Sequence, residues 1–274
     1  MIDSMNDRAV LANGVRMPWV GLGMWKVPSE EAAAPVAGAL RMGYRLVDTA
    51  AVYRNEDGIG EGLRQSGIPR EQLFITTKLW NEDIRRDRVA QAFEESLQRL
   101  GLDYVDLYLM HWPVPDKFAE AWQQMLRIYE SGRARAIGVC NCAVHHLEEL
   151  ERSSGVRPMV NQVERHPLLS QQPMRRYCRE HGILLQAYSP LMQGRLDQPL
   201  FTELAAKYGR TPAQVILRWH LQQGVAAIPK SVHAQRQRQN MDLFGFTLTP
   251  DDMDRIDAFN QDRRFCADPD HFDF

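Results

Sequence analysis

Short apolar stretches alternate with longer amphipathic stretches along almost the whole chain. The apolar stretches are about five residues long, which is the usual length of a strand, and are bounded by small or polar residues. This pattern predicts strands at residues 19–23, 44–47, 73–77, 104–110, 134–139, 158–163, 183–188 and 225–228.

An amphipathic stretch with helical spacing follows each of these strands. Eight strand and helix pairs in succession are typical of a parallel (β/α)8 TIM barrel, which usually has about 250 residues. No linker-like or low-complexity stretch interrupts the series, so we expect one α/β domain over residues 1–274. The expected helices span residues 29–42, 56–65, 86–100, 117–131, 145–152 and 171–181, with two more, one starting near Thr211 and one ending at Asn240.

Two further elements are expected outside the barrel series. Residues 10–18 read as a β-hairpin in which Asn13 and Gly14 supply both positive φ values of a type I′ turn, and it precedes the barrel as a lid or plug. Thr211 and Thr249, each followed by Pro, are typical helix starts. The second of them predicts a last helix outside the barrel.

Composition and charge narrow the classes of partner. The chain has 274 residues, of which 44% are hydrophobic and 25% charged, with a net charge of -2 and a pI near 6.5. This balance gives no general attraction to nucleic acid or to an anionic membrane, so small molecules are the expected partners. Residues 1–8 lack the apolar core of a signal peptide, and no run approaches the ~20 apolar residues of a membrane span. We expect a cytoplasmic protein.

The cysteines indicate neither a disulfide framework nor a metal site. The four of them form no CxxC pair, which suits a reducing compartment. Cys140 and Cys142 lie near His145 and His146, but this spacing matches none of the usual zinc patterns. We expect no metal, and interpret these residues as buried thiols and surface histidines of a helix.

Four chemically capable side chains follow three neighbouring strands. Asp48 and Tyr53 come after the second strand, Lys78 after the third and His111 after the fourth. In a barrel of this kind the carboxyl ends of all strands face the same way, so these four residues are expected to meet at one mouth. Taken singly, each has an ordinary interpretation as a helix cap, a packed ring, a solvated charge or a rim histidine. Their coincidence favours an active site.

The combination suits proton donation to a carbonyl group that receives a hydride. The pKa of a free tyrosine is near ~10, and an ammonium group beside Tyr53 is expected to lower it toward the working range. Lys78 supplies that charge, Asp48 holds the lysine in place, and His111 orients the carbonyl oxygen. Trp25, Trp80 and Trp112 follow strands one, three and four and predict an apolar pocket at the same mouth, unless they simply pack beneath loops.

A phosphate site is expected after the eighth strand. Residues 21–26 fail the GxGxxG pattern at its last position, so a Rossmann site is not indicated. Lys230 and Arg236 instead flank the start of the last barrel helix, where such barrels often bind phosphate. They suit the extra phosphate of NADP, although an isolated basic cluster is also common on a solvated helix face.

The residues also resemble a known family. The chain is similar to aldo-keto reductases, above all to the bacterial branch that includes 2,5-diketo-D-gluconate reductases. The resemblance extends over nearly the whole chain and rests on the ordered segments NGVRMPWVGLGMWKV, RLVDTAAVYRNEDGIGEGL, ITTKLWN, DLYLMHWP, VNQVERHP, AYSPL, TPAQVILRW and IPKSV.

The resemblance implies a role for many residues. Tyr53 would be the general acid, tuned by Asp48 and Lys78, and His111 would orient the substrate. Residues 259–274 would close over the substrate as a flexible tail. The cofactor NADPH would be bound by two residues at the nicotinamide carboxamide (Asn141 and Gln162), by Tyr188 stacked on the ring, by Lys230, Ser231 and Arg236 at the 2′-phosphate, by Asn240 near the adenine, and by Cys140, Ser189, Leu191, Val232 and Gln239 along the same groove.

Three residues depart from the pattern of the family. Cys140 stands where Ser is common, which weakens one hydrogen bond to the nicotinamide amide. Gln239 replaces a frequent acid near the adenine, and Met192 occupies a position where Gly is common. These changes bear on cofactor affinity and on the preference for NADPH over NADH, and leave the four catalytic candidates unchanged.

The expected function is NADPH-dependent reduction of aldehydes, ketones or dicarbonyls, such as 2,5-diketogluconate or methylglyoxal, by a monomeric enzyme. One alternative is an NADPH-binding regulatory or interaction protein with little catalysis. Another is a cofactor-free hydrolase or isomerase that uses His111 and Asp48. Arg263 and Arg264 in the tail either meet an acidic substrate or are solvated, and we favour the latter.

Overall fold

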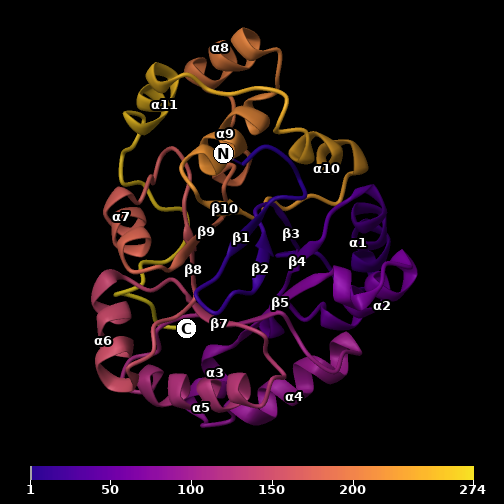
Figure 1. Cartoon of the computed structure of the whole chain (residues 1–274), viewed down its shortest axis with the longest axis vertical. Helices are drawn as coiled ribbons and strands as arrows, with labels where there is room; N and C mark the ends of the chain where they lie inside the picture. Colours follow the sequence, from indigo (N-terminus) through magenta and orange to yellow (C-terminus); the bar gives the residue numbers. More distant parts are fainter. Residues whose placement is uncertain (1) are drawn as a thin grey trace.

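A closed barrel of parallel strands forms the centre of the molecule (Figure 1). The structure is a computed structural model that describes residues 2–274. The strands follow one another around the barrel in chain order, and bridges from Val20 to Ala227 and from Gly23 to Lys230 join the last strand to the first. The (β/α)8 prediction is therefore confirmed. The barrel strands are β3 (Gly21–Gly23), β4 (Leu46–Asp48), β5 (Phe74–Leu79), β6 (Leu107–Met110), β7 (Ile137–Cys140), β8 (Val160–Glu164), β9 (Leu184–Tyr188) and β10 (Ala226–Ala227).

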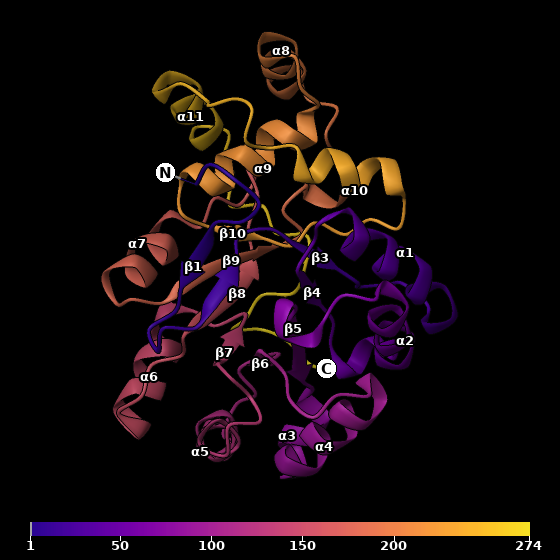
Figure 2. The same ribbon diagram turned by 45° about the vertical axis from the view of Figure 1, so that its right-hand side comes forward.

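A ring of helices covers the outside of the barrel (Figure 2). These helices bury the apolar stripe that the sequence predicts, packing it against the outer face of the strands. No helix in the described part of the chain has the length and apolar character needed to cross a membrane. The ring consists of α1 (Ser29–Met42), α2 (Glu56–Ser66), α4 (Val89–Leu100), α5 (Phe118–Glu130), α6 (Val144–Ser154), α7 (Gln172–Glu180), α9 (Pro212–Gln222) and α10 (Ala234–Met241).

Additional helices lie outside the eight pairs. The last helix, α11 (Pro250–Asp257), begins at its predicted Thr249 cap. The short α3 (Asn81–Arg85) and the longer α8 (Pro199–Tyr208) were not expected. Helix α8 forms because its apolar side chains pack with those of α9 and α11 in a separate cluster that includes Phe201, Trp219 and Ile256. The remaining short turns are the 3-10 helices η1 (Ala51–Tyr53), η2 (Arg70–Gln72) and η3 (Met192–Gly194).

The predicted hairpin is present as β1 (Arg8–Val10) and β2 (Arg16–Pro18), but its turn type was wrong. The Leu11 N–H donates to the Val15 carbonyl, and within the loop between them only Gly14 has positive φ. This is a three-residue loop with a glycine bulge, which does not require Asn13 to adopt positive φ. Met17 and Leu11 pack against the first residues of several barrel strands, so the hairpin plugs the amino-terminal end of the barrel.

Polarity inside the barrel changes from one end to the other. The amino-terminal end is filled by apolar side chains such as Leu46, Phe74 and Leu107, beneath the hairpin plug. Polar side chains appear at the carboxyl ends of several strands, where Asp48 ends β4 and Glu164 ends β8, with Lys78 one position before the end of β5. Because the amino-terminal end is plugged and apolar, these polar side chains can reach a ligand only at the carboxyl-terminal end of the barrel.

One glycine is required where the barrel closes. A Cβ atom at Gly23 would lie 2.8 Å from the carbonyl oxygen of Ile228, beside the bridge that joins β3 to the segment after β10. The close approach of these two backbones therefore excludes any side chain at this position.

Candidate active site

A cavity of about 1220 Å³ opens at the carboxyl ends of the strands. The structure brings three of the four predicted catalytic residues, Asp48, Tyr53 and His111, to its lining, while Lys78 lies fully buried beside Asp48. All three predicted tryptophans also line this cavity. Trp112 is buried and Trp25 is 40% exposed at the rim. Much of the remaining lining comes from the predicted cofactor residues Cys140, Asn141, Gln162, Tyr188, Ser189, Leu191, Lys230, Ser231, Arg236, Gln239 and Asn240.

A buried ion pair lies at the base of the catalytic end. The Lys78 Nζ donates to Asp48 Oδ1 at 2.5 Å and to the Thr49 carbonyl at 2.8 Å, and both charged side chains are almost completely buried. Burial is the largest single effect and disfavours the ammonium charge, but the charge and hydrogen bond of Asp48, together with Tyr53 and Cys140, outweigh it, and the pKa of Lys78 is raised. Lys78 therefore stays positively charged although it is shielded from water.

Tyr53 lies directly above this pair. Its ring follows β4 through the short helix η1, and the Lys78 Nζ is 5.0 Å from the ring centroid. Burial raises the pKa of Tyr53 to about 12, while Lys78 acts to lower it. The expectation that Lys78 brings this pKa below its ordinary value was therefore wrong for this structure, because loss of hydration has the larger effect.

His111 stands beside Tyr53 as a neutral ring. Its centroid is 5.6 Å from that of Tyr53 and 5.3 Å from that of Trp80, both in edge-on contact. Burial, assisted by the nearby Lys78 charge, lowers the pKa of His111 well below its ordinary value. A neutral imidazole can donate one hydrogen bond to an oxygen atom in the cavity without placing a second cation beside Lys78.

Asn55 positions the loops around Tyr53, and the sequence did not single it out. Its amide nitrogen donates to the carbonyls of Met24 and Val27, and its Oδ1 accepts a hydrogen bond from Thr49. Asn55 is fully buried, so it ties the loop after β3 to the loop after β4. The only signal in the sequence was a polar residue just before a helix, which is more often exposed.

The amide groups of Asn141 and Gln162 are oriented by neighbours. Asn141 has a φ of 58°, donates from Nδ2 to the His111 carbonyl and accepts from the Tyr188 hydroxyl at 2.7 Å. Gln162 donates from Nε2 both to Asp48 Oδ2 and to Gln186 Oε1, each at 2.8 Å. Gln162 therefore presents its oxygen as the remaining group, and Asn141 retains one N–H.

The opposite end of the same cavity is basic. Lys230 and Arg236 are exposed there, and neither forms an ion pair with an acidic side chain of residues 2–274. Gln237 donates to the Ser231 carbonyl and thereby holds the start of α10 against the segment after β10. Val232 was predicted to line the cofactor groove, but it does not line this cavity and packs against the apolar core instead.

Met192, at a position where the family commonly has Gly, has a backbone conformation that explains the usual glycine. Its φ is 53°, in the left-handed region that glycine adopts without strain. The side chain is fully buried in the cluster that contains α8, so apolar packing offsets the cost of this backbone conformation.

The tail contributes lining residues that the sequence did not identify individually. Phe265, Cys266 and Phe274 face the cavity. Phe274 stacks on Trp80, with ring centroids 5.9 Å apart and ring planes at 2° to each other. Neither Arg263 nor Arg264 lines this cavity. Arg263 is exposed, whereas Arg264 is half-buried and lies 3.9 Å from Asp268.

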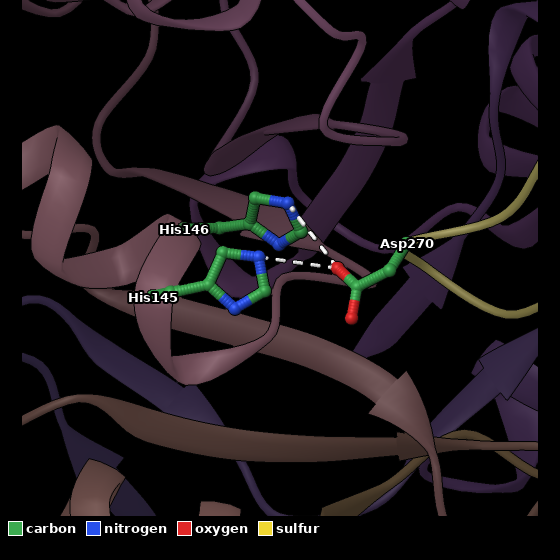
Figure 3. Close-up of side chains that lie close together, drawn as sticks. All are labelled: His145, His146 and Asp270. Atoms are coloured by element: carbon green, nitrogen blue, oxygen red, sulfur yellow. Dashed lines mark ion pairs between the residues drawn. The ribbon is translucent and has the colours of Figure 1, made fainter.

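A group of potential metal ligands lies where the tail meets the start of α6 (Figure 3). His145, His146 and Asp270 bring ligand atoms within 4.8 Å of one another, whereas Cys140 lines the large cavity and Cys142 packs in the core. The Nδ1 atom of His146 accepts the Ala143 N–H at 3.0 Å, so the neutral ring carries its proton on Nε2, which faces Asp270. A metal ion needs a lone pair at that atom. The arrangement therefore favours a proton-bearing contact over a metal centre.

The chain was compared with known families and proteins. A sequence profile described as the Aldo/keto reductase family matches residues 19–261. The chain is 51% identical to a protein named glyoxal reductase from Bacillus subtilis (strain 168), with full coverage of both chains. It is 46% identical to methylglyoxal reductase DkgA from Escherichia coli (strain K12), over 96% of each chain.

Solved structures of proteins with similar sequences have the same fold. A crystal structure of a Gox0644 mutant in complex with NADPH has a TM-score of 0.93 and 41% identity, and the match covers 97% of this chain and 98% of the other. An aldo-keto reductase from Bombyx mori in complex with NADP has a TM-score of 0.90 and 37% identity, with 98% and 97% coverage.

Proposed function

The chain belongs to the aldo/keto reductase family, and we propose that it uses NADPH to reduce small aldehydes and dicarbonyls to alcohols. Relatives named glyoxal reductase and methylglyoxal reductase support this substrate class, and structural neighbours in complex with NADPH or NADP support the cofactor. The observation that carries the proposal is a single cavity with Tyr53 above the buried Lys78–Asp48 pair at one end and free basic side chains at the other.

The residues present fit NADPH at both of its ends. The free Nδ2 hydrogen of Asn141 suits the carboxamide oxygen, and Gln162 Oε1 suits the carboxamide NH₂, because the other groups of both side chains are already bonded. Tyr188, fixed by its bond to Asn141, offers a ring face for stacking. Lys230 and Arg236, which form no ion pair with an acidic side chain of residues 2–274, are available for the 2′-phosphate.

When bound, NADPH supplies a hydride to the carbonyl carbon, and NADP⁺ and an alcohol are the products. The side chains of this protein would donate the proton and stabilise the charge that develops on the carbonyl oxygen. Tyr53 is protonated at neutral pH, as a tyrosine of ordinary pKa already is, and burial, which raises its pKa to about 12, keeps this proton available for the carbonyl oxygen. The Lys78 ammonium stabilises the phenolate that is left, and neutral His111 donates a hydrogen bond that orients the oxygen.

The two alternatives use less of what the structure contains. A cofactor-free hydrolase or isomerase has no need for the exposed cations Lys230 and Arg236, which line the cavity and have no acidic partner among the described residues. A regulatory NADPH-binding protein has no need for a costly buried ion pair beneath a tyrosine. The reductase accounts for both features.

The test is NADPH consumption with methylglyoxal and glyoxal, followed in the wild type and in Tyr53→Phe. Loss of the proton donor is expected to lower kcat by about 10² to 10⁴. NADPH binding, measured by fluorescence titration, should be unchanged in the variant. A wild type that binds NADPH but reduces no carbonyl compound would favour the regulatory protein, and one that does not bind NADPH would favour the cofactor-free enzyme.

A further inference from the structure

The tail after α11 is attached to the barrel at separate points. Its first part is held by β8 and the following loop, where Glu164 accepts hydrogen bonds from the N–H groups of Phe265 and Cys266 at 2.8 and 3.0 Å. The Leu168 carbonyl accepts the N–H of Arg263 at 2.9 Å. These bonds fix the base of the tail and leave the course of residues 267–274 to other contacts.

Asp270 provides a second attachment, at the start of α6. Its Oδ1 lies 3.1 Å from His145 Nε2 and 3.6 Å from His146 Nε2, at the start of α6 (Figure 3). The His146 ring is itself fixed, because Ala143 donates to its Nδ1 and its edge contacts the Phe118 ring at 5.6 Å. His146 therefore presents a fixed ring to one carboxylate oxygen, and the His145 ring lies beside it with the two centroids 4.0 Å apart.

The end of the tail forms a wall of the cavity. Phe274 stacks on Trp80 and contacts Trp112 edge-on at 5.1 Å, and Phe272 contacts Trp112 at 5.0 Å. Trp80 in turn touches His111. The position of Phe274 thus determines how much space is available next to the residues expected to handle the carbonyl oxygen.

The Phe274 carbonyl also accepts hydrogen bonds from Asn81 and Arg85 at 3.1 and 2.8 Å, which hold its backbone near Trp80. We propose that Asp270 is a positioning residue for substrate selection: by contacting His145 and His146 it fixes the course of residues 267–274 and helps to keep the Phe274 ring against Trp80, which closes the pocket around short carbonyl compounds and excludes bulky ones. This inference rests on the proposed reductase function and adds a structural reason for a small substrate. Asp270 touches no reacting atom, so its effect acts through Phe274.

The kinetic test compares three variants. Asp270→Ala removes the contact, and Asp270→Asn keeps an oxygen acceptor for the N–H of neutral His146. Asp273→Ala is the matched control, because Asp273 is an exposed carboxylate of the same tail that forms no ion pair with residues 2–274. Each is assayed with methylglyoxal and with the bulkier 4-nitrobenzaldehyde.

Asp270→Ala is expected to raise the KM for methylglyoxal about threefold to tenfold, since the lost contact is a partly exposed one. The kcat for methylglyoxal and the affinity for NADPH should change by less than about twofold, and the preference for methylglyoxal over 4-nitrobenzaldehyde should fall. Asp270→Asn should retain most of the preference. Equal preference in Asp270→Ala and Asp273→Ala would overturn the proposal.

Hydrogen exchange tests the same positioning without any turnover. The peptide covering residues 265–274 should exchange faster in Asp270→Ala than in the wild type or Asp273→Ala, while peptides of the barrel strands should not change. Unchanged exchange in the tail would refute the role of Asp270 even if the enzyme is active. A wild type inactive toward both aldehydes would instead refute the proposed function, and the exchange result would still decide the role of Asp270.

Discussion

The positively charged side chains at the two ends of the large cavity differ in burial and in pairing. At one end Lys78 is completely buried and is paired with Asp48 at 2.5 Å. At the other end Lys230 and Arg236 are exposed and have no acidic partner within the described residues. A buried charge has to be neutralised within the protein, whereas an exposed charge is solvated by water and stays available to a charged ligand. The difference separates a charge that serves the chemistry from charges that serve binding.

The largest expected effect comes from removing the negative charge of Asp48, the partner of the buried Lys78. Asp48→Asn should destabilise the fold by about 3 to 5 kcal/mol, because Lys78 would remain as an uncompensated buried cation. Urea unfolding measures this change. The control is Glu61→Gln, which removes an exposed ion pair with Arg64 and should leave the urea midpoint almost unchanged. Equal losses in the two variants would contradict the assigned importance of burial.

At the exposed end, the expected loss is in binding and not in stability. Arg236→Met should weaken NADPH binding about tenfold to a hundredfold, because a charge-assisted hydrogen bond to phosphate contributes about 1.5 to 3 kcal/mol. Binding of NADH, which lacks that phosphate, should change little. Arg238→Met on the same helix is the matched control, since Arg238 does not line the cavity. The assignment of Arg236 fails if both variants behave alike.

A smaller effect is expected midway between the two ends. Cys140 has its Sγ 3.8 Å from Gln162 Oε1, so it gives at most a weak hydrogen bond. Cys140→Ser should tighten NADPH binding by about twofold to tenfold, which corresponds to about 0.5 to 1.5 kcal/mol for one added hydrogen bond. Fluorescence titration measures the Kd. An unchanged or weaker affinity would show that the hydroxyl has no suitable partner there.

The smallest expected change concerns pH. Tyr53 must be protonated to act as an acid, and burial raises its pKa to about 12. The proton is therefore present throughout the neutral range and is lost only as the pH rises toward that value. We expect kcat/KM for reduction to vary less than about twofold from pH 7 to 9 through this group. Circular dichroism at each pH serves as the control for unfolding, and a tenfold decline across this range would imply a much lower pKa in the working enzyme.

The barrel and the meeting of its active-site candidates were accessible from the sequence. Parallel strands in a barrel all end on the same side, so residues at equivalent positions meet even when they are far apart in the chain. That rule placed Asp48, Tyr53 and His111 at one mouth without knowledge of any contact. Helix α8 was missed because its stability depends on packing with α9 and α11, which the local pattern does not reveal.

The residue types and their order along the strands were thus determined by the sequence alone. The tertiary structure decided how each of them is charged and held. Burial and not Lys78 governs the pKa of Tyr53, and Gln186 and Asp48 orient Gln162. Asp270 contacts His145 and His146, which lie far from it in the sequence. The physical reason is that hydration, hydrogen-bond direction and contacts between distant segments depend on distances in space, which a linear pattern does not contain.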